Sequence, residues 1–291
     1  HLGSMSESIK TVISRNRETM QPGDVFALNN PFNGGTHIPD VTVVTPAWNS
    51  SQDEVLFYVA SRGHHAEVGG ISPGSMPPFS KTIMDEGVLL DNVKLVDRGR
   101  VCEDEILAIL TSGPLPSRNP QQNLADLRAQ IAANEKGVAE LHKMVNQFGL
   151  ETVAAYMGHV RNLASQSVRS AIKLLPKELS GDGTFECRLD NRAVVRVAVS
   201  LDRTRGTAHI DFTGSSEQGE GNLNAPKAVT IAAVLYVVRT LVEDAIPLNS
   251  GCLEPITITI PEGSILNPKF PAAVVAGNVE VSTCVDRKSV V

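Results

Sequence analysis

The spacing of apolar residues predicts a helix followed by buried strands in the first part of the chain. Residues 1–20 carry Met5, Ile9, Val12 and Ile13 near helical spacing, which is typical of an amphipathic helix. Short apolar runs then predict strands at residues 25–28, 41–44 and 55–60. Because the last two runs are mostly apolar, we expect both strands to be buried on both faces.

The middle of the chain predicts two long helices. Between residues 121 and 148, apolar residues recur at alternating spacings of three and four, interrupted only by Asn134. Gly149 suits a turn, after which the rhythm resumes at Val153, Tyr156, Val160 and Leu163. The simplest interpretation is a helical hairpin that packs on its neighbour. The alternative is a coiled coil that docks another subunit.

After Pro176 the pattern changes to that of strands. Three runs predict an antiparallel β meander at residues 184–189, 193–201 and 207–212. A buried helix is expected at residues 226–242, with Pro226 in its first turn, and a last strand at residues 256–260.

The predicted fold class is therefore α+β with mixed sheets, and we divide the chain into three parts. Residues 1–120 form an α+β region that carries the candidate site loops, residues 121–178 form the helical hairpin, and residues 179–291 form a β-rich region with a buried helix. The change of pattern places a boundary near residues 176–182.

Composition indicates a folded globular protein and argues against nucleic-acid and membrane binding. Of the 291 residues, 42% are apolar and 20% are charged, and the net charge is −6. Basic residues do not cluster, so electrostatic binding to nucleic acid or anionic lipid is not expected. The longest apolar run, residues 228–238, is too short to span a bilayer. The four cysteines form no CxxC pair, which favours a reducing, cytoplasmic compartment over a disulfide or zinc scaffold.

The first candidate for chemistry is the glycine-rich loop at residues 29–40, which contains His37 and Asp40. An imidazole and a carboxylate three residues apart suit a divalent metal such as Zn, Mn or Fe, or a general-base pair. Such pairs also arise by chance, and His37 could equally cap the strand that follows.

The second candidate is the loop at residues 63–78, which contains His64, His65 and Glu67. Adjacent side chains on an extended segment point in opposite directions. One histidine is thus able to ligate a metal while the other faces substrate or a carboxylate; the alternative is two ordinary surface histidines. Two strand-exit loops with histidine and carboxylate favour a metal site between neighbouring strands. Phosphate-binding loops and a nucleophile elbow are absent.

Long motifs resemble those of the hydantoinase B/5-oxoprolinase family. They read GGTHIPDVTVVTP at residues 34–46, FYVASRGHHAEVGGISPGSMPP at residues 57–78, NLADLRAQIAANEKG at residues 123–137, IPLNSGCLEPI at residues 246–256 and AAVVAGNVEVST at residues 272–283. These matches follow one another in order along nearly the whole chain. The resemblance implies a metal-dependent module that opens a cyclic amide, with 5-oxo-L-proline converted to L-glutamate.

The resemblance also implies a division of labour. A partner half of the hydantoinase A type, fused or separate, binds ATP and Mg and phosphorylates the lactam oxygen. On this chain it implies His37, Asp40 and His64 as ligands of a divalent metal, and His65 and Glu67 as catalytic residues. Alternatives are a hydantoin or N-methylhydantoin hydrolase subunit, a subunit resembling the alpha subunit of acetone carboxylase, and a non-catalytic assembly module. A hetero- or homo-oligomer is expected.

Two departures from the family pattern affect these expectations. Glu67 stands where the family usually has aspartate, which moves the carboxylate by about one carbon. The family pattern also continues beyond both ends of this chain, and residues 284–291 do not suit the apolar helix expected there. We therefore interpret the chain as a fragment that is inactive alone.

Overall fold

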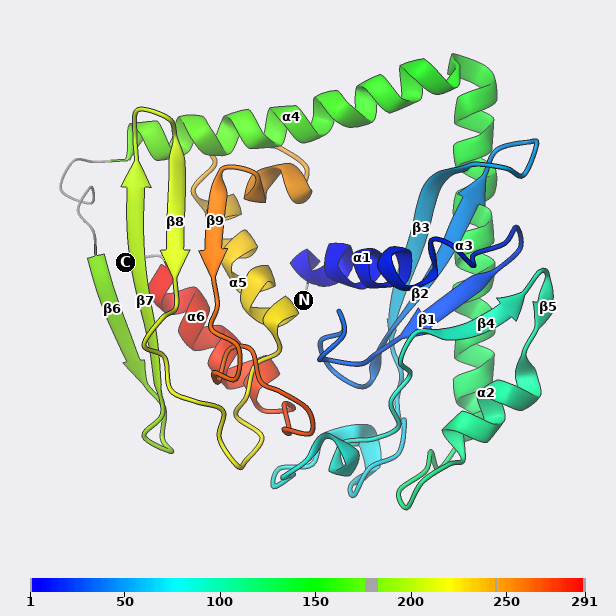
Figure 1. The fold of residues 1–291 in the computed structure, drawn as a ribbon, viewed down its shortest axis with the longest axis horizontal. Helices are drawn as coiled ribbons and strands as arrows, with labels where there is room; N and C mark the ends of the chain where they lie inside the picture. Colours follow the sequence, from blue (N-terminus) through cyan, green and yellow to red (C-terminus); the bar gives the residue numbers. More distant parts are fainter. Residues whose placement is uncertain (1, 176–182, 244, 290–291) are drawn as a thin grey trace.

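The computed structural model describes residues 2–175, 183–243 and 245–289, and it contains two β-sheets with helices around them (Figure 1). The first sheet has five antiparallel strands in the order β3-β2-β1-β4-β5. Its strands are β1 (Val25–Leu28), β2 (Asp40–Trp48), β3 (Val55–His64), β4 (Val93–Asp97) and β5 (Arg100–Val101).

Alternate residues of β1 face opposite layers of the first sheet. Val25 and Ala27 pack in a cluster with residues of α3 (Pro120–Phe148), whereas Phe26 and Leu28 pack with Val12 of α1 (Met5–Asn16). The predicted strands at residues 25–28 and 41–44 are thus confirmed as buried elements. The strand at residues 55–60 is confirmed as well, but our prediction that both its faces are buried is wrong. It belongs to β3, a half-buried strand at the sheet edge, which continues to His64.

Helix α3 covers the first sheet and confirms the helix predicted from residue 121. Asn119 caps its start by accepting a hydrogen bond from the backbone N–H of Gln122 at 3.3 Å, and Pro120 occupies the first turn. Asn134, which interrupts the apolar spacing, is buried and donates to the carbonyl of Val43 at 3.0 Å. The polar interruption is therefore an anchor to β2. The short helix α2 (Glu103–Leu110) packs beside α3.

The second long helix, α4 (Leu150–Leu174), begins directly after Gly149 and leads away from α3 toward the second sheet (Figure 1). It packs on β7, β8 and the short helix η5 (Ser250–Leu253), while α3 packs on β2 and β3. The predicted hairpin seam is consequently mostly uncovered: Tyr156 is 68% exposed and Leu163 is 53% exposed. The two helices meet at Gly149 but bridge the sheets instead of burying their apolar stripes together.

The second sheet has four strands in the order β6-β7-β8-β9 and confirms the predicted meander. Its strands are β6 (Gly183–Arg188), β7 (Val194–Asp202), β8 (Thr207–Asp211) and β9 (Ile256–Thr259), the last parallel to β8. The predicted buried helix is present as α5 (Lys227–Thr240). The predicted boundary at residues 176–182 lies outside the described residues.

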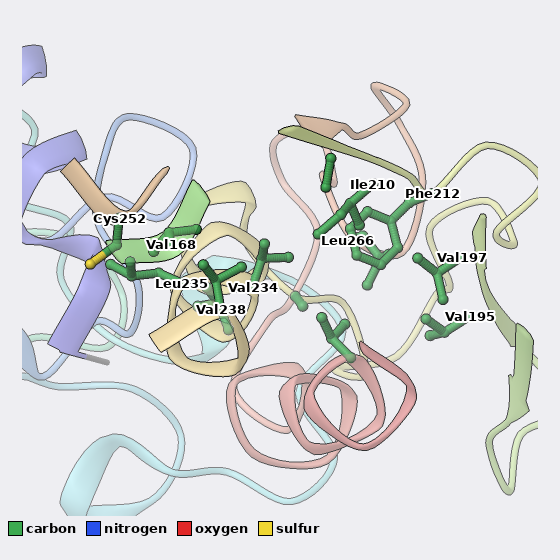
Figure 2. Close-up of a cluster of buried hydrophobic side chains, with 14 of the residues drawn as sticks. Val168, Val195, Val197, Ile210, Phe212, Val234, Leu235, Val238, Cys252 and Leu266 are labelled. Carbon is green, nitrogen blue, oxygen red and sulfur yellow. The ribbon is translucent and has the colours of Figure 1, made fainter. Parts of the chain in front are cut away.

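Figure 2 shows the largest apolar core, which joins the second sheet to its helices. Val195, Val197 and Phe212 from the sheet region lie in one cluster with Val168 of α4 and Leu235 of α5. The last helix, α6 (Ser282–Ser289), adds Val285 to the same core. None of the helices in the described ranges is long and apolar enough to cross a membrane.

Candidate functional site

Loop 29–40 is held in a tight conformation that sets the positions of His37 and Asp40. Asn29 is fully buried; its amide donates to the carbonyls of Ile38 at 2.8 Å and Val88 at 3.0 Å, and its oxygen accepts from the N–H of Leu90 at 2.7 Å. Gly35 packs so closely that a Cβ there would lie 2.4 Å from the carbonyl oxygen of Asn29. Only glycine fits this approach, and the chain then enters β2 at Asp40.

The three predicted metal ligands lie together at one end of the β2–β3 pair. Asp40 is paired in register with His64, and its Oδ1 lies 2.8 Å from Nδ1 of His64. The ring of His37 lies 5.7 Å from the ring of His64, centroid to centroid. Strand pairing therefore brings loop 29–40 and the end of β3 to one place, as expected from two neighbouring strand-end loops.

Burial keeps His37 uncharged at neutral pH. Its side chain is 7% exposed, and desolvation lowers the pKa of His37 to about 4, with Asp40 opposing the shift and His64 adding to it. Nε2 lies 3.1 Å from the sulfur of Met76. Nδ1 is buried and has no hydrogen-bond partner among the described residues. A neutral imidazole with an unpaired buried nitrogen is suited to bind a cation or accept a proton.

The donor set fits a metal in chemistry, although it is not drawn together around one point. In the described ranges, no group of three or more His, Cys, Asp or Glu side chains is arranged to hold a metal ion. Asp40 and His64 bond to each other instead. Two imidazoles and a carboxylate are nonetheless the ligand types that Zn, Mn and Fe prefer, and Nδ1 of His37 is buried without a hydrogen-bond partner among the described residues.

The other two predicted site residues hold the loop after β3 to helix α3. His65 is 3% exposed; its Nε2 lies 3.0 Å from Oε1 of Gln130 and its Nδ1 lies 3.3 Å from Nδ2 of Asn123. Both ring nitrogens thus contact α3, on the side opposite to the Asp40 contact of His64. The structure does not bring the His65 side chain together with the three candidate ligands.

Glu67 forms a salt bridge with Arg118. Its carboxylate accepts from the guanidinium of Arg118 at 2.7 Å, and from the backbone N–H groups of Arg118 at 2.8 Å and Gly69 at 2.6 Å. Burial acts to raise the pKa of Glu67, but these hydrogen bonds outweigh it and hold the pKa below its usual value. Glu67 is therefore an ionised anchor of the loop that begins after β3.

Three polar residues near the site escaped the sequence analysis. Arg62 lies two residues before His64 on β3 and donates to Thr42 at 2.8 Å and to Ser4 and Ser8 of the N-terminal helical segment. Arg62 and Asn278 stand inside motifs that we quoted without being singled out, whereas Glu86 lies outside the quoted motifs.

Glu86 joins the two halves of the molecule, the one built around the first sheet and the one built around the second sheet. It is fully buried, and its Oε1 accepts from the backbone N–H groups of Val274 at 2.8 Å and Val275 at 3.0 Å and from the hydroxyl of Ser80 at 2.8 Å. Its Oε2 has no hydrogen-bond partner within the described part of the chain. Desolvation raises the pKa of Glu86 to about 7.

Comparison with known proteins identifies relatives along the whole chain. A family model described as hydantoinase B/oxoprolinase matches residues 1–286. The chain is 43% identical to 5-oxoprolinase 1 of Arabidopsis thaliana and 42% identical to the 5-oxoprolinase of Saccharomyces cerevisiae. Each match covers 97% of this chain but only 24% and 22% of the two relatives. The chain thus spans about a quarter of their length.

The fold is similar to the crystal structure of ATP-dependent caprolactamase from Pseudomonas jessenii. The TM-score is 0.84 at 24% sequence identity, over 98% of this chain and 48% of that chain. This likeness confirms the predicted α+β fold class, in which both proteins share the same arrangement of helices and mixed sheets.

Proposed function

Because this chain belongs to the hydantoinase B/oxoprolinase family, we propose that it is the metal-bearing module of an ATP-dependent hydrolase of cyclic amides. The observation that carries the proposal is His37, a buried and neutral imidazole whose Nδ1 is unpaired beside Asp40 and His64. The proposed substrate is 5-oxo-L-proline, because relatives that match 97% of the chain are named 5-oxoprolinases.

The proposed reaction is divided between two protein modules. An A-type half, with its own ATP and Mg, phosphorylates the lactam oxygen and makes the ring carbon a better electrophile. Water then adds to that carbon, the C–N bond breaks, and the nitrogen takes a proton. Two water molecules are consumed overall, one in opening the ring and one in releasing phosphate, and the products are L-glutamate, ADP and inorganic phosphate.

This chain's part in the reaction is to place and orient the groups around the reacting carbon. His37, Asp40 and His64 would hold a divalent cation, Mn, Zn or Fe, which when bound polarises water or the lactam. Asp40 bonds to Nδ1 of His64 and so selects the orientation of that imidazole. His37 needs no deprotonation before it binds a cation, because burial already keeps it neutral.

We assign His65 and Glu67 to positioning. Their contacts with Gln130 and Arg118 fix the loop that follows His64 against α3. Both side chains thereby support the orientation of His64 without meeting the three candidate ligands.

The proposed partner is the A-type half, fused or separate, in a cytoplasmic assembly. An apolar groove with a volume of about 1040 Å³ supports docking of a partner. It lies between the end of α3 and the start of α4, and its lining includes Phe57, Met144, Phe148, Tyr156 and Met157. The structure places no disulfide among the described residues, which supports a reducing compartment.

The experiment that tests this proposal measures the metal content of the purified chain by elemental analysis. We expect near-stoichiometric Mn, Zn or Fe, which His37→Ala and His64→Ala should both lose. His142→Ala is the matched control, because His142 bonds to the carbonyl of Trp48 at 2.9 Å and not to the candidate site.

Activity is tested by adding a separately purified A-type half. We expect ATP-dependent formation of glutamate with the unmodified chain and with His142→Ala, and none with the two site variants. A folded, unmodified chain that binds no metal would contradict the metal role. Equal metal content in all four proteins would show that the metal is held elsewhere.

A further inference from the structure

We propose that Asn278, from the second half of the chain, contributes its side-chain oxygen to the occupant of the His37 site. The inference rests on the proposed function, which places a divalent cation at His37, Asp40 and His64. It adds a ligand-contacting residue that lies 242 positions from Thr36 in sequence and meets the site only through the fold.

Asn278 is fixed in place by both hydrogens of its amide. It lies in the π-helical turn η6 (Gly277–Val281), immediately before α6, and is 5% exposed. Nδ2 donates to the carbonyl of Thr36 at 3.0 Å and to the carbonyl of Val274 at 3.1 Å. Because both partners are acceptors, the orientation of the amide is determined.

The side-chain oxygen of Asn278, unlike its nitrogen, lacks a hydrogen-bond partner among the described residues. Oδ1 of Asn278 is buried and accepts no hydrogen bond from any described residue, and Nδ1 of His37 is in the same condition. Thr36, which Asn278 contacts, directly precedes His37, and its hydroxyl lies 3.4 Å from Oδ2 of Asp40. Buried polar atoms without partners are costly. Two such atoms on adjoining segments, both with lone pairs to offer, are explained together by one bound cation.

A second buried asparagine, Asn224, contacts the segment just before Asn278 and has a purely structural role. Asn224 is fully buried; its Nδ2 donates to the carbonyls of Gly219, Gly221 and Ala273, and its Oδ1 accepts from the N–H of Gly219 at 2.8 Å. Every polar atom of its side chain is satisfied within the protein. Asn278 differs in having an oxygen left over.

The ligand types narrow the choice of cation. An amide oxygen and a carboxylate suit harder cations such as Mn²⁺, and imidazole suits Fe and Zn. The combined set of two imidazoles, one carboxylate and one amide oxygen therefore favours Mn²⁺, which accepts all three ligand types.

The test is a Mn²⁺ titration of the purified full chain, followed by the paramagnetic resonance signal of free Mn²⁺. Asn278→Ala should weaken Mn²⁺ binding by at least about tenfold, the loss typical of a removed metal-site contact. Asn278→Asp keeps an oxygen but loses the two N–H donors, so it should bind Mn²⁺ as tightly as the unmodified chain or more tightly. Asn224→Ala is the matched control, with lower stability and unchanged affinity per folded molecule.

The outcomes separate this inference from the proposed function. If Asn278→Asp weakens Mn²⁺ binding as much as Asn278→Ala does, the residue acts through its donors and the ligand assignment is wrong. If His37→Ala abolishes binding while Asn278→Ala leaves it unchanged, only the present inference fails. An unmodified chain that binds no Mn²⁺ overturns the inference and the proposed Mn²⁺ site together.

Discussion

Burial determines the protonation state of His37, whereas hydrogen bonds determine that of Glu67. Desolvation lowers the pKa of His37 to about 4, so its imidazole is neutral across the physiological range even though Asp40 opposes the shift. Metal binding to an imidazole requires the unprotonated form. His37 is therefore prepared for a cation, whereas Glu67 is held ionised by hydrogen bonds and serves as an anchor.

Gly35 provides a prediction at the scale of one residue. A Cβ at this position would lie 2.4 Å from the carbonyl oxygen of Asn29, a contact that no side-chain movement relieves. Gly35→Ala should lower the free energy of unfolding by about 2 kcal/mol and weaken cation binding, because the displaced loop carries His37. Urea unfolding followed by circular dichroism measures the first effect, and Mn²⁺ titration measures the second.

The control for this prediction is Gly219→Ala. A Cβ at Gly219 would meet no atom within 4 Å, so the free energy of unfolding should change by no more than about 0.5 kcal/mol. Similar losses in the two variants would show that conformational freedom, and not the contact with Asn29, explains the result.

The sequence predicts that His37, Asp40 and His64 lie near one another, because their placement depends on local features. His37 and Asp40 lie three residues apart, and strand pairing places His64 opposite Asp40. The same reasoning could not assign His65, because its contacts with Gln130 and Asn123 depend on where α3 lies. Asn278 lies in a motif that we quoted, but its contact with Thr36 could not be predicted, since the two residues are far apart along the chain.

At the scale of elements, periodicity predicts helices but not what covers them. The apolar spacing of α3 and α4 is real, yet α3 uses its stripe on the first sheet and α4 packs on the second. The two helices share only the turn at Gly149 and diverge from it (Figure 1). A hairpin and a bridge between two sheets give the same sequence pattern, which is why the sequence alone favoured the simpler of the two.

Asn134 provides the prediction for α3. It is 1% exposed, and its amide donates to the carbonyl of Val43 at 3.0 Å and to the hydroxyl of Thr45 at 3.2 Å. Asn134→Leu completes the apolar spacing but removes these donors from buried acceptors, so we expect a loss of about 1–3 kcal/mol in the free energy of unfolding. Urea unfolding measures it. Asn146→Leu, at an exposed position of the same helix, should be nearly neutral; a stabilised Asn134→Leu would contradict the anchor.

At the scale of the whole molecule, the candidate site lies where the two halves of the fold meet. Glu86 bonds to the backbone of Val274 and Val275, and Asn278 bonds to the carbonyl of Thr36. The N-terminal turn at Gly3 also packs on Leu235 of α5. Polar side chains buried at this junction connect the segment that carries His37 to the second half of the chain. In the site as we propose it, with Asn278 as a contact, both halves contribute to the site.

Glu86 makes this junction sensitive to pH. In the unfolded chain its carboxyl ionises near 4.5, whereas burial raises the pKa of Glu86 in the folded protein to about 7. Between these values the folded protein binds more protons than the unfolded chain, so this residue's contribution to stability is present at low pH and is lost as pH rises toward 7. The full difference is at most about 3.5 kcal/mol, from roughly 1.4 kcal/mol for each pKa unit.

Glu86→Gln removes this titration while keeping an oxygen for the N–H groups of Val274 and Val275. Relative to the unmodified chain, the variant should gain stability between pH 5 and pH 8, by at most about 3 kcal/mol, in urea unfolding measured at several pH values. Taking the difference between the two proteins cancels the other titrating groups, including His37, which acts in the opposite direction. Glu54→Gln, at an exposed position, should follow the unmodified chain at every pH. Parallel stability curves for Glu86→Gln and the unmodified chain would show that Glu86 ionises normally and that the junction tolerates its charge.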